Sequence, residues 1–325
     1  MKAPMTMQAS DSGILCLGEA LVDRLGPPGG DPANDAPVDD RLGGAPANVA
    51  CGLARLGTPV AFAGRLGQDA IGDAFAALFA DRGIDRSLLQ RDPQRPSRIV
   101  LVRRTGDGER QFQGFAGDQG AGFADQALEP AALPQARWLL IGTLPLAAPA
   151  SASALLAAVQ QARSNDTAIA LDVNWRPTFW DATADPGAGP DQRAMALIRP
   201  LLEQAALIKL AREEALWFFD TDEPGEIQRL LPQRPDVVVT DGAAPVRWCL
   251  ADQSGVQPAF HPPDVVDTTG AGDAFTAGLL HRWSASPSER VRFAAACGAL
   301  VCGGAGGIDP QPSEVQVERF LGSVS

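Results

Sequence analysis

A short glycine-rich segment holds the residues of this chain that are best suited to chemistry. Asp267-Thr-Thr-Gly-Ala-Gly-Asp273 follows Val265 and Val266, which we interpret as the end of a strand, and it opens a helix that carries Phe275. Small residues leave backbone amides uncovered at a helix start, where unpaired N–H groups and the helix dipole favour an anion. Asp273 would place a base beside a bound phosphate, as phosphoryl transfer to a hydroxyl requires. The alternative is an aspartate that only caps the helix.

Two better-known phosphate-binding motifs are excluded. A dinucleotide-binding fingerprint needs G-x-G-x-x-G, but Phe275 stands at the position of the third glycine. A P-loop needs a lysine directly after a glycine-rich turn, and the chain's two lysines, Lys2 and Lys209, do not follow one. If the protein uses ATP, it does so without a Walker motif.

Composition narrows the class of protein. With 325 residues, 45% of them hydrophobic, the chain can bury one large core or two modest ones. The formal net charge of -12 disfavours nucleic-acid and anionic-membrane partners, because both favour a basic surface. The five scattered cysteines and two histidines offer little to a metal site or a Ser–His hydrolase triad. No signal-peptide pattern and no apolar run of about 18 residues occurs, so we expect a cytoplasmic protein.

The apolar segments alternate between strand and helix patterns. Strands are expected at 14–22, 60–63, 138–141, 168–172, 207–210 and 237–240. Helices are expected at 47–56, 71–82, 152–163, 192–202, 212–219, 290–302 and 313–321. This alternation predicts an α/β fold with a mainly parallel sheet covered on both faces. Other segments do not fit it: 1–12 is expected to be an unstructured leader, 26–40 a loop, and 97–104 with 110–115 a hairpin of a small extra sheet.

Polar and glycine residues gather where the predicted strands end. They are Asp23, residues 172–176, residues 240–242 and residues 267–270. Ligands of open α/β sheets bind outside the carboxyl ends of the strands. This convergence indicates a binding site and argues against a purely structural protein.

Two signatures at opposite ends of the chain resemble those of the ribokinase-like (PfkB-type) carbohydrate kinases. Gly43-Gly-Ala-Pro-Ala-Asn-Val-Ala-Cys-Gly-Leu-Ala-Arg-Leu-Gly57 is similar to the N-terminal signature of the family, and Asp267–Asp273 to its C-terminal signature. The resemblance covers nearly the whole chain. It implies a single domain over 13–322, with a three-layer α/β/α core and a small β-sheet lid built from approximately 22–42 and 96–116. The lid would close over the sugar.

Within the family, three segments look most like fructokinases. They are Gly18-Glu-Ala-Leu-Val-Asp23, Gly43-Gly-Ala-Pro-Ala-Asn48 and Asp172-Val-Asn-Trp-Arg-Pro177. The resemblance therefore implies transfer of a phosphoryl group from ATP to a sugar, D-fructose first, with Mg2+ and often K+ as cofactors. The 2-keto-3-deoxygluconate kinases share much of this pattern and are the closest alternative.

The family motifs also imply roles for individual residues. Asp273 would be the general base, and Gly270, Ala271 and Gly272 would form the anion hole. Asp23, Gly43, Gly44 and Asn48 would hold sugar hydroxyls, and Arg176 would lie near the transferred phosphate or a substrate anion. Lys209, Thr240, Gly242 and Ala295 would lie along the nucleotide. Glu214 would hold Mg2+ through water, and the backbones of Asp267 and Thr269 would lie near the monovalent cation.

The chain departs from the family pattern at three positions. The Asn-x-x-Glu motif falls on Ala211-Arg-Glu-Glu214, Pro245 replaces a usual glycine, and Ala295 stands where Asn is often found. A catalytically silent sugar or nucleotide sensor is a second interpretation, which the intact Asp273 disfavours. A nicotinamide oxidoreductase is a third, disfavoured by the missing fingerprint. The sequence does not reveal the oligomeric state, and a homodimer through the lid stays open.

Overall fold

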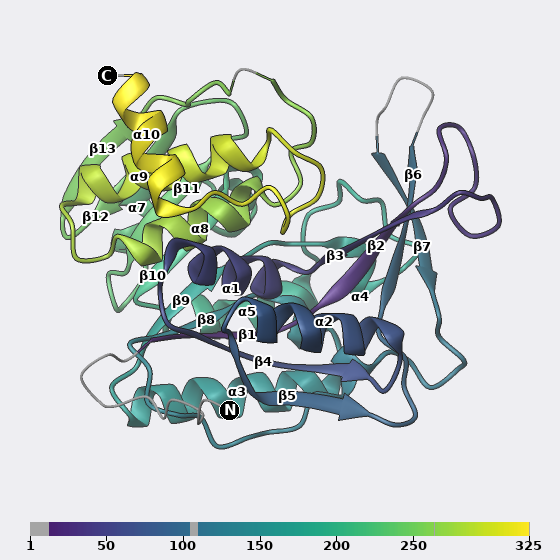
Figure 1. Ribbon diagram of the computed structural model, residues 1–325. Helices are drawn as coiled ribbons and strands as arrows, with labels where there is room; N and C mark the ends of the chain where they lie inside the picture. Colours follow the sequence, from purple (N-terminus) through teal and green to yellow (C-terminus); the bar gives the residue numbers. More distant parts are fainter. Residues whose placement is uncertain (1–12, 105–109, 263, 325) are drawn as a thin grey trace, which may run out of the picture.

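A computed structural model describes residues 13–104, 110–262 and 264–324, which form a large sheet covered by helices and a smaller, separate sheet (Figure 1). The large sheet has nine strands in the order β13-β12-β11-β10-β9-β8-β1-β4-β5. Their bounds, in chain order, are β1 Ile14–Leu17, β4 Val60–Gly67, β5 Asp85–Asp92, β8 Trp138–Ile141, β9 Ala168–Asp172, β10 Leu207–Ala211, β11 Asp236–Thr240, β12 Val246–Leu250 and β13 Gln253–Gln257. All neighbouring pairs are parallel except β11–β12 and β12–β13.

Helices cover both faces of the large sheet. One face carries α1 (Ala45–Leu56), α2 (Ala70–Asp81), α8 (Ala271–His281), α9 (Pro287–Val301) and α10 (Glu314–Ser323), and the other carries α3 (Pro149–Ser164), α5 (Gln192–Leu202), α6 (Arg212–Phe219) and α7 (Pro224–Leu230). Strand β1 shows why the sheet needs both layers. Its successive side chains point to opposite faces, so Cys16 joins one buried cluster while Leu15 and Leu17 join the other.

The small sheet has the order β3-β2-β6-β7 and stands beside the core (Figure 1). Its strands are β2 Leu21–Leu25, β3 Asp39–Gly43, β6 Ile99–Arg104 and β7 Arg110–Ala116. Strands β6 and β7 pair antiparallel, which confirms the predicted hairpin, while β2 and β6 pair parallel. The turn of that hairpin lies outside the described residues.

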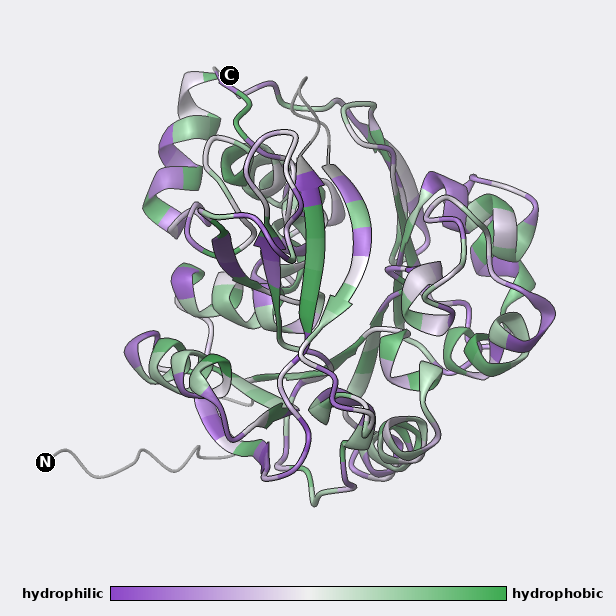
Figure 2. Cartoon of the chain, turned by 90° about the vertical axis from the view of Figure 1, so that its right-hand side faces the viewer, coloured by the Kyte–Doolittle hydropathy of each residue, from purple (hydrophilic) through white to green (hydrophobic). Residues whose placement is uncertain are grey.

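The three-layer α/β/α core with a mainly parallel sheet and a small extra sheet is the predicted fold class. The bounds of β8, β9, α5 and α6 also agree with the sequence patterns. Hydrophobic residues concentrate on strands and on inward helix faces (Figure 2). All five cysteines are free and buried, as expected of small apolar side chains.

Three local predictions were wrong. The single strand at 14–22 is two strands in different sheets, because the chain turns at Gly18, whose φ of 154° favours glycine. The loop at 26–40 ends where β3 begins at Asp39. Val265 and Val266 form no strand and are 64% and 61% exposed.

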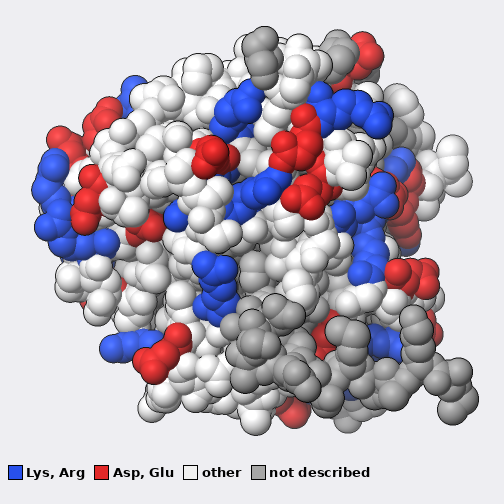
Figure 3. Space-filling view, turned by 60° about the vertical axis from the view of Figure 1, so that its left-hand side comes forward, with Lys and Arg blue, Asp and Glu red and all other residues white. Residues whose placement is uncertain are grey.

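Basic and acidic side chains are mixed on the surface. On the face shown in Figure 3, basic side chains lie in small groups among acidic ones, without a continuous basic surface. Among the described helices, none combines the length and apolarity needed to cross a membrane.

Candidate active site

A cavity of about 610 Å3 is lined by both sheets and by the start of α8. The small sheet contributes Asp23 and Phe112 to its wall, and the core contributes Lys209 of β10 and residues that follow the carboxyl end of β9, such as Arg176. Ten predicted site residues line it: Asp23, Gly44, Asn48, Arg176, Lys209, Thr269, Gly270, Ala271, Gly272 and Asp273. The fold thus brings together residues up to 250 positions apart in sequence, as expected for a site outside the carboxyl ends of the strands.

Asp273 lies in the first turn of α8, and its Oδ2 accepts a hydrogen bond of 2.7 Å from Nδ2 of Asn48 on α1. Burial raises the pKa of Asp273 from 3.8 to about 6, and the nearby carboxylate of Asp172 adds to the rise. The Asn48 hydrogen bond and the cations of Lys209 and Arg176 oppose it. The result is a carboxylate that is ionised at neutral pH yet basic enough to accept a proton.

The turn before α8 requires glycine. Gly270 caps the helix with a φ of 79°, and a Cβ there would lie 2.5 Å from Cα of Gly307. The amide of Ala271 already donates to the carbonyl of Thr268 at 3.2 Å. Gly270 and Gly272 contribute the other small-residue amides of this helix start, where N–H groups have no intrahelical acceptor.

Lys209 lies beside this helix start. A Cβ on Gly272 would be 3.0 Å from its Nζ, so glycine leaves room for the ammonium group. Nζ lies 3.1 Å from Oδ1 of Asp172, whose Oδ2 accepts a hydrogen bond from Thr276 of α8. Burial lowers the pKa of Lys209, but the carboxylates of Asp172, Glu214 and Asp273 outweigh burial and keep the pKa above its usual value. The ammonium group is therefore a fixed positive charge beside the glycine turn.

One polar atom of the Asn48 side chain has a hydrogen-bond partner and the other does not. Its Nδ2 donates to Asp273, whereas its Oδ1 is buried and has no hydrogen-bond partner among the described residues. A buried acceptor without a partner costs about 1–3 kcal/mol. A ligand hydroxyl that donates to Oδ1 would remove this cost, so the wall of the cavity is suited to a polyhydroxylated ligand.

Glu214 is buried on α6, away from the cavity wall. Its Oε2 accepts from the amide of Ala211 at 2.7 Å, and its Oε1 accepts from the amide of Trp175 at 2.6 Å. Burial raises the pKa of Glu214, and the positive charge of Lys209 opposes this rise. The carboxylate therefore ties the start of α6 to the segment that carries Arg176.

The remaining predicted residues lie outside the cavity wall. Gly43 precedes the wall residue Gly44, and Thr240 ends β11, where its Oγ1 donates to the Leu210 carbonyl at 3.3 Å. Gly242 has a φ of 52° in the loop after β11. Ala295 is buried in α9.

Asp267 holds together the loop before α8. Its Oδ1 accepts from the amide and the hydroxyl of Thr269, and its Oδ2 accepts from the amide of Gly306 at 2.7 Å. Within the described part of the chain, no group of three or more His, Cys, Asp or Glu side chains could hold a metal ion. A metal at this site would need ligands from a substrate and from water.

The sequence motifs gave no individual role to two polar residues of the site. Glu19 lines the cavity, and Asp172 anchors Lys209. Glu19 follows β1 and Asp172 ends β9, and this position at the end of a buried strand is the feature of the sequence that could have identified them. Their contacts depend on tertiary packing that the sequence does not show.

Comparison with known proteins gives a consistent result. A family model described as pfkB family carbohydrate kinase matches residues 11–314. The chain is 32% identical to a probable chloroplastic fructokinase-6 of Arabidopsis thaliana, over 95% of this chain and 82% of that protein.

Two solved structures are also similar. A fructokinase from Xylella fastidiosa with bound ATP has a TM-score of 0.80 and 28% identity, and it covers 96% of this chain and 98% of its own. A fructokinase from Vibrio cholerae O395 in a fructose-, ADP- and calcium-bound form has a TM-score of 0.80 and 29% identity, and it covers 96% and 99%.

Proposed function

The chain belongs to the pfkB family of carbohydrate kinases, and we propose that it transfers the γ-phosphoryl group of ATP to D-fructose, forming fructose 6-phosphate. One observation carries the proposal: Asp273 and the open Oδ1 of Asn48 share one cavity with a glycine turn and the ammonium group of Lys209. The fructokinases that resemble this chain over nearly its full length support fructose as the acceptor.

Asp273 acts as the general base. With a pKa of about 6 it is mainly ionised at neutral pH, and it takes the proton of the attacking primary hydroxyl. Asn48 orients the carboxylate through its Nδ2 and binds the sugar through its Oδ1. One side chain thereby fixes the base and the substrate relative to each other.

The start of α8 receives the transferred phosphoryl group. Amides of Gly270 and Gly272 face the developing charge, Ala271 shapes the turn, and the helix dipole favours an anion there. Lys209 stands beside Gly272, so we assign it to the phosphate end of the nucleotide. Arg176 lines the same cavity and supplies a second cation.

The small sheet supplies the sugar side of the site and acts as a lid. Asp23 of β2 and the Gly43–Gly44 turn hold further hydroxyls, and Phe112 of β7 covers the cavity with an apolar ring. Closure of this sheet would exclude water and limit hydrolysis of ATP. Its outer strands β3 and β7 are also the edges through which a homodimer would form, which light scattering can test.

The nucleotide extends from the glycine turn toward Thr240, Gly242 and Ala295. When bound, Mg2+ would offset the charge of the phosphates, with water and the nucleotide supplying most of its ligands. The carboxylate of Glu214 has further lone pairs, which would accept hydrogen bonds from water molecules bound to Mg2+. The loop that Asp267 and Thr269 brace is the proposed site of K+.

Rates of ADP release with a panel of acceptors test the proposed function. Fructose should give the highest kcat/KM among fructose, ribose, 2-keto-3-deoxygluconate and adenosine. A higher value for 2-keto-3-deoxygluconate would assign the chain to that kinase group, with Arg176 as the partner of the substrate carboxylate. Release of ADP that no acceptor stimulates would contradict a sugar kinase.

A further inference from the structure

The mechanism leaves one buried carboxyl oxygen of the cavity without a role. Glu19 lies between β1 and β2, is 5% exposed, and lines the main cavity. Its Oε1 accepts from the amide of Ala45 at the start of α1, at 3.1 Å. Its Oε2 has no hydrogen-bond partner among the described residues. A buried polar atom in this state needs an explanation, and a ligand is one.

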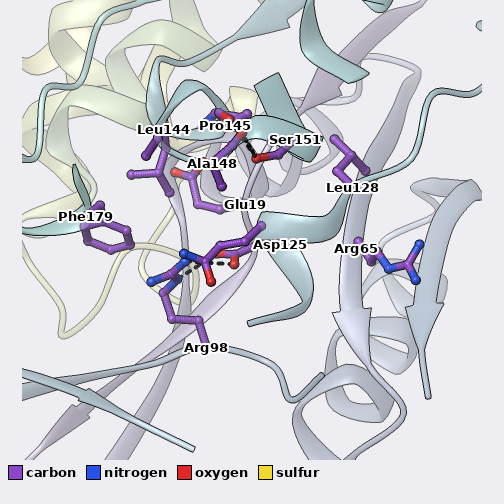
Figure 4. Close-up of a pocket in the computed structure, with 13 residues that line it drawn as sticks. Glu19, Arg65, Arg98, Asp125, Leu128, Leu144, Pro145, Ala148, Ser151 and Phe179 are labelled. Atoms are coloured by element: carbon purple, nitrogen blue, oxygen red, sulfur yellow. Dashed lines mark hydrogen bonds and ion pairs between the residues drawn. The ribbon is translucent and has the colours of Figure 1, made fainter. Parts of the chain in front are cut away.

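Glu19 also borders a second, smaller cavity, shown in Figure 4. That cavity has a volume of about 10 Å3, roughly the space of one water molecule. A sugar ring does not fit there. A sugar hydroxyl that contacts Glu19 would therefore come from the main cavity, which Asp273 and Asn48 also line.

Nearby cations do not neutralise Glu19, because both bind other carboxylates. Arg98 makes hydrogen bonds of 2.8 and 2.9 Å to Asp125, and its guanidinium group packs against aromatic rings that include Phe179 (Figure 4). Arg65 pairs with Asp92 at 3.0 Å and with Glu129 at 2.7 Å. Both nearby arginines are thus paired with other carboxylates, and neither offsets a negative charge on Glu19.

The protonation state follows from these surroundings. Burial raises the pKa of Glu19 to about 8, the backbone amides of Glu19 and Ala45 oppose the rise, and Asp125 and Asp273 add to it. Glu19 is therefore mainly neutral at pH 7. A neutral carboxyl group offers a donor and an acceptor, which matches the two capacities of a hydroxyl group.

We propose that Glu19 is a specificity-determining residue that exchanges hydrogen bonds through Oε2 with a non-reacting hydroxyl of the sugar acceptor. The proposal rests on the proposed sugar kinase function. A site that binds a hydroxyl with a buried polar group rejects analogues that misplace this hydroxyl, since the protein group is then left unpaired. The competing explanation is that Glu19 only anchors the start of α1 through Ala45.

Epimers of fructose separate these explanations. We would measure kcat/KM for fructose and for its C3, C4 and C5 epimers with wild type, Glu19→Leu and Glu19→Gln. Glu19→Leu should lower the value for fructose about ten- to a hundredfold, and lower it less than about threefold for the epimer altered at the contacted carbon. Glu19→Gln should retain the preference for fructose, because its amide can accept from Ala45 and donate to the sugar.

Ser151→Ala is the matched control. Ser151 lines the small cavity, but its hydroxyl already donates to the Pro145 carbonyl at 2.7 Å, so this variant should leave the ratios between epimers unchanged. An equal loss with all four sugars in Glu19→Leu would show that Glu19 only anchors α1, and would overturn the proposal. Wild type that phosphorylates none of the four sugars would instead contradict the proposed function, and the assignment of Glu19 with it.

If Glu19→Leu does not fold, the pH dependence of the KM for fructose in wild type and Glu19→Gln distinguishes the two explanations. Wild-type KM for fructose should rise as the pH passes about 8, because Glu19 ionises and loses its donor. Glu19→Gln has no such proton and should keep a constant KM from about pH 7 to 9.5. Identical KM profiles for the two proteins would refute the proposal.

Discussion

Replacing Asp273 by Asn should abolish most activity and at the same time stabilise the protein. The variant keeps the size of the side chain and an oxygen that can accept from Asn48. It loses the base, which typically contributes about 10²–10⁴ in rate. It also removes a carboxylate that burial and the charge of Asp172 disfavour in the folded state.

The size of the stabilisation follows from the pKa of Asp273. Each tenfold change in proton affinity corresponds to about 1.4 kcal/mol, so a pKa raised from 3.8 to about 6 destabilises the folded ionised form by about 3 kcal/mol. The folded state binds this proton more tightly than the unfolded state. Ionisation of Asp273 therefore lowers the stability of wild type as the pH rises through the window between these two pKa values, and the Asn variant lacks this contribution.

Urea denaturation at a series of pH values, together with the initial rate of ADP release, measures both effects. The free energy of unfolding of the variant should equal that of wild type near pH 3.5 and exceed it by about 3 kcal/mol above about pH 7. Asp252→Asn, at a side chain that is 81% exposed, is the control and should change neither quantity. Activity above about a tenth of wild type would refute the assignment of the base. A stability gain that does not depend on pH would refute the electrostatic reasoning.

Three further predictions concern the groups around this base. Asn48→Ala should raise the KM for fructose and shift the acidic limb of kcat/KM to higher pH, because the Asn48 hydrogen bond lowers the pKa of Asp273; an unmoved limb would contradict the coupling. Glu214→Gln should raise the Mg2+ concentration for half-maximal rate with little change in fructose KM, and an unchanged Mg2+ dependence would place the metal elsewhere. Hydrogen exchange in β6 and β7 should slow when fructose saturates the protein, whereas equal exchange with and without the sugar would argue for a static sheet.

Most buried elements were predictable from sequence, although the buried strand β12 was missed, and the edge strands β5 and β13 were not predicted. Strands such as β8 are continuous apolar runs because helices cover both faces of the sheet. Strand β5 is at the edge and carries mostly polar residues, and β13, at the other edge, is largely exposed. Neither strand has an apolar pattern. Each is recognised as a strand only by its hydrogen bonds to one neighbouring strand. The pair Val265–Val266 shows the opposite error, since apolar type alone does not establish burial.

The chemistry of the site was predictable by residue type, but its arrangement was not. The glycine turn and Asp273 are adjacent in sequence, so local spacing was sufficient to group them. The position of Lys209 beside Gly272 depends on how β10 packs against α8. The uncompensated Oε2 of Glu19 depends on which partners Arg98 and Arg65 choose, and only the folded structure determines that.

Identifying the reaction product tests most directly whether Asp273 directs phosphoryl transfer to fructose. Phosphorus NMR of the protein with ATP, Mg2+ and fructose should show fructose 6-phosphate and ADP that accumulate at equal rates, and Asp273→Asn should show almost none of either. Phosphate on another position of the sugar would contradict the proposed acceptor hydroxyl. Formation of inorganic phosphate and ADP without a sugar phosphate, or equal turnover by the variant, would contradict the central claim that Asp273 directs phosphoryl transfer to fructose.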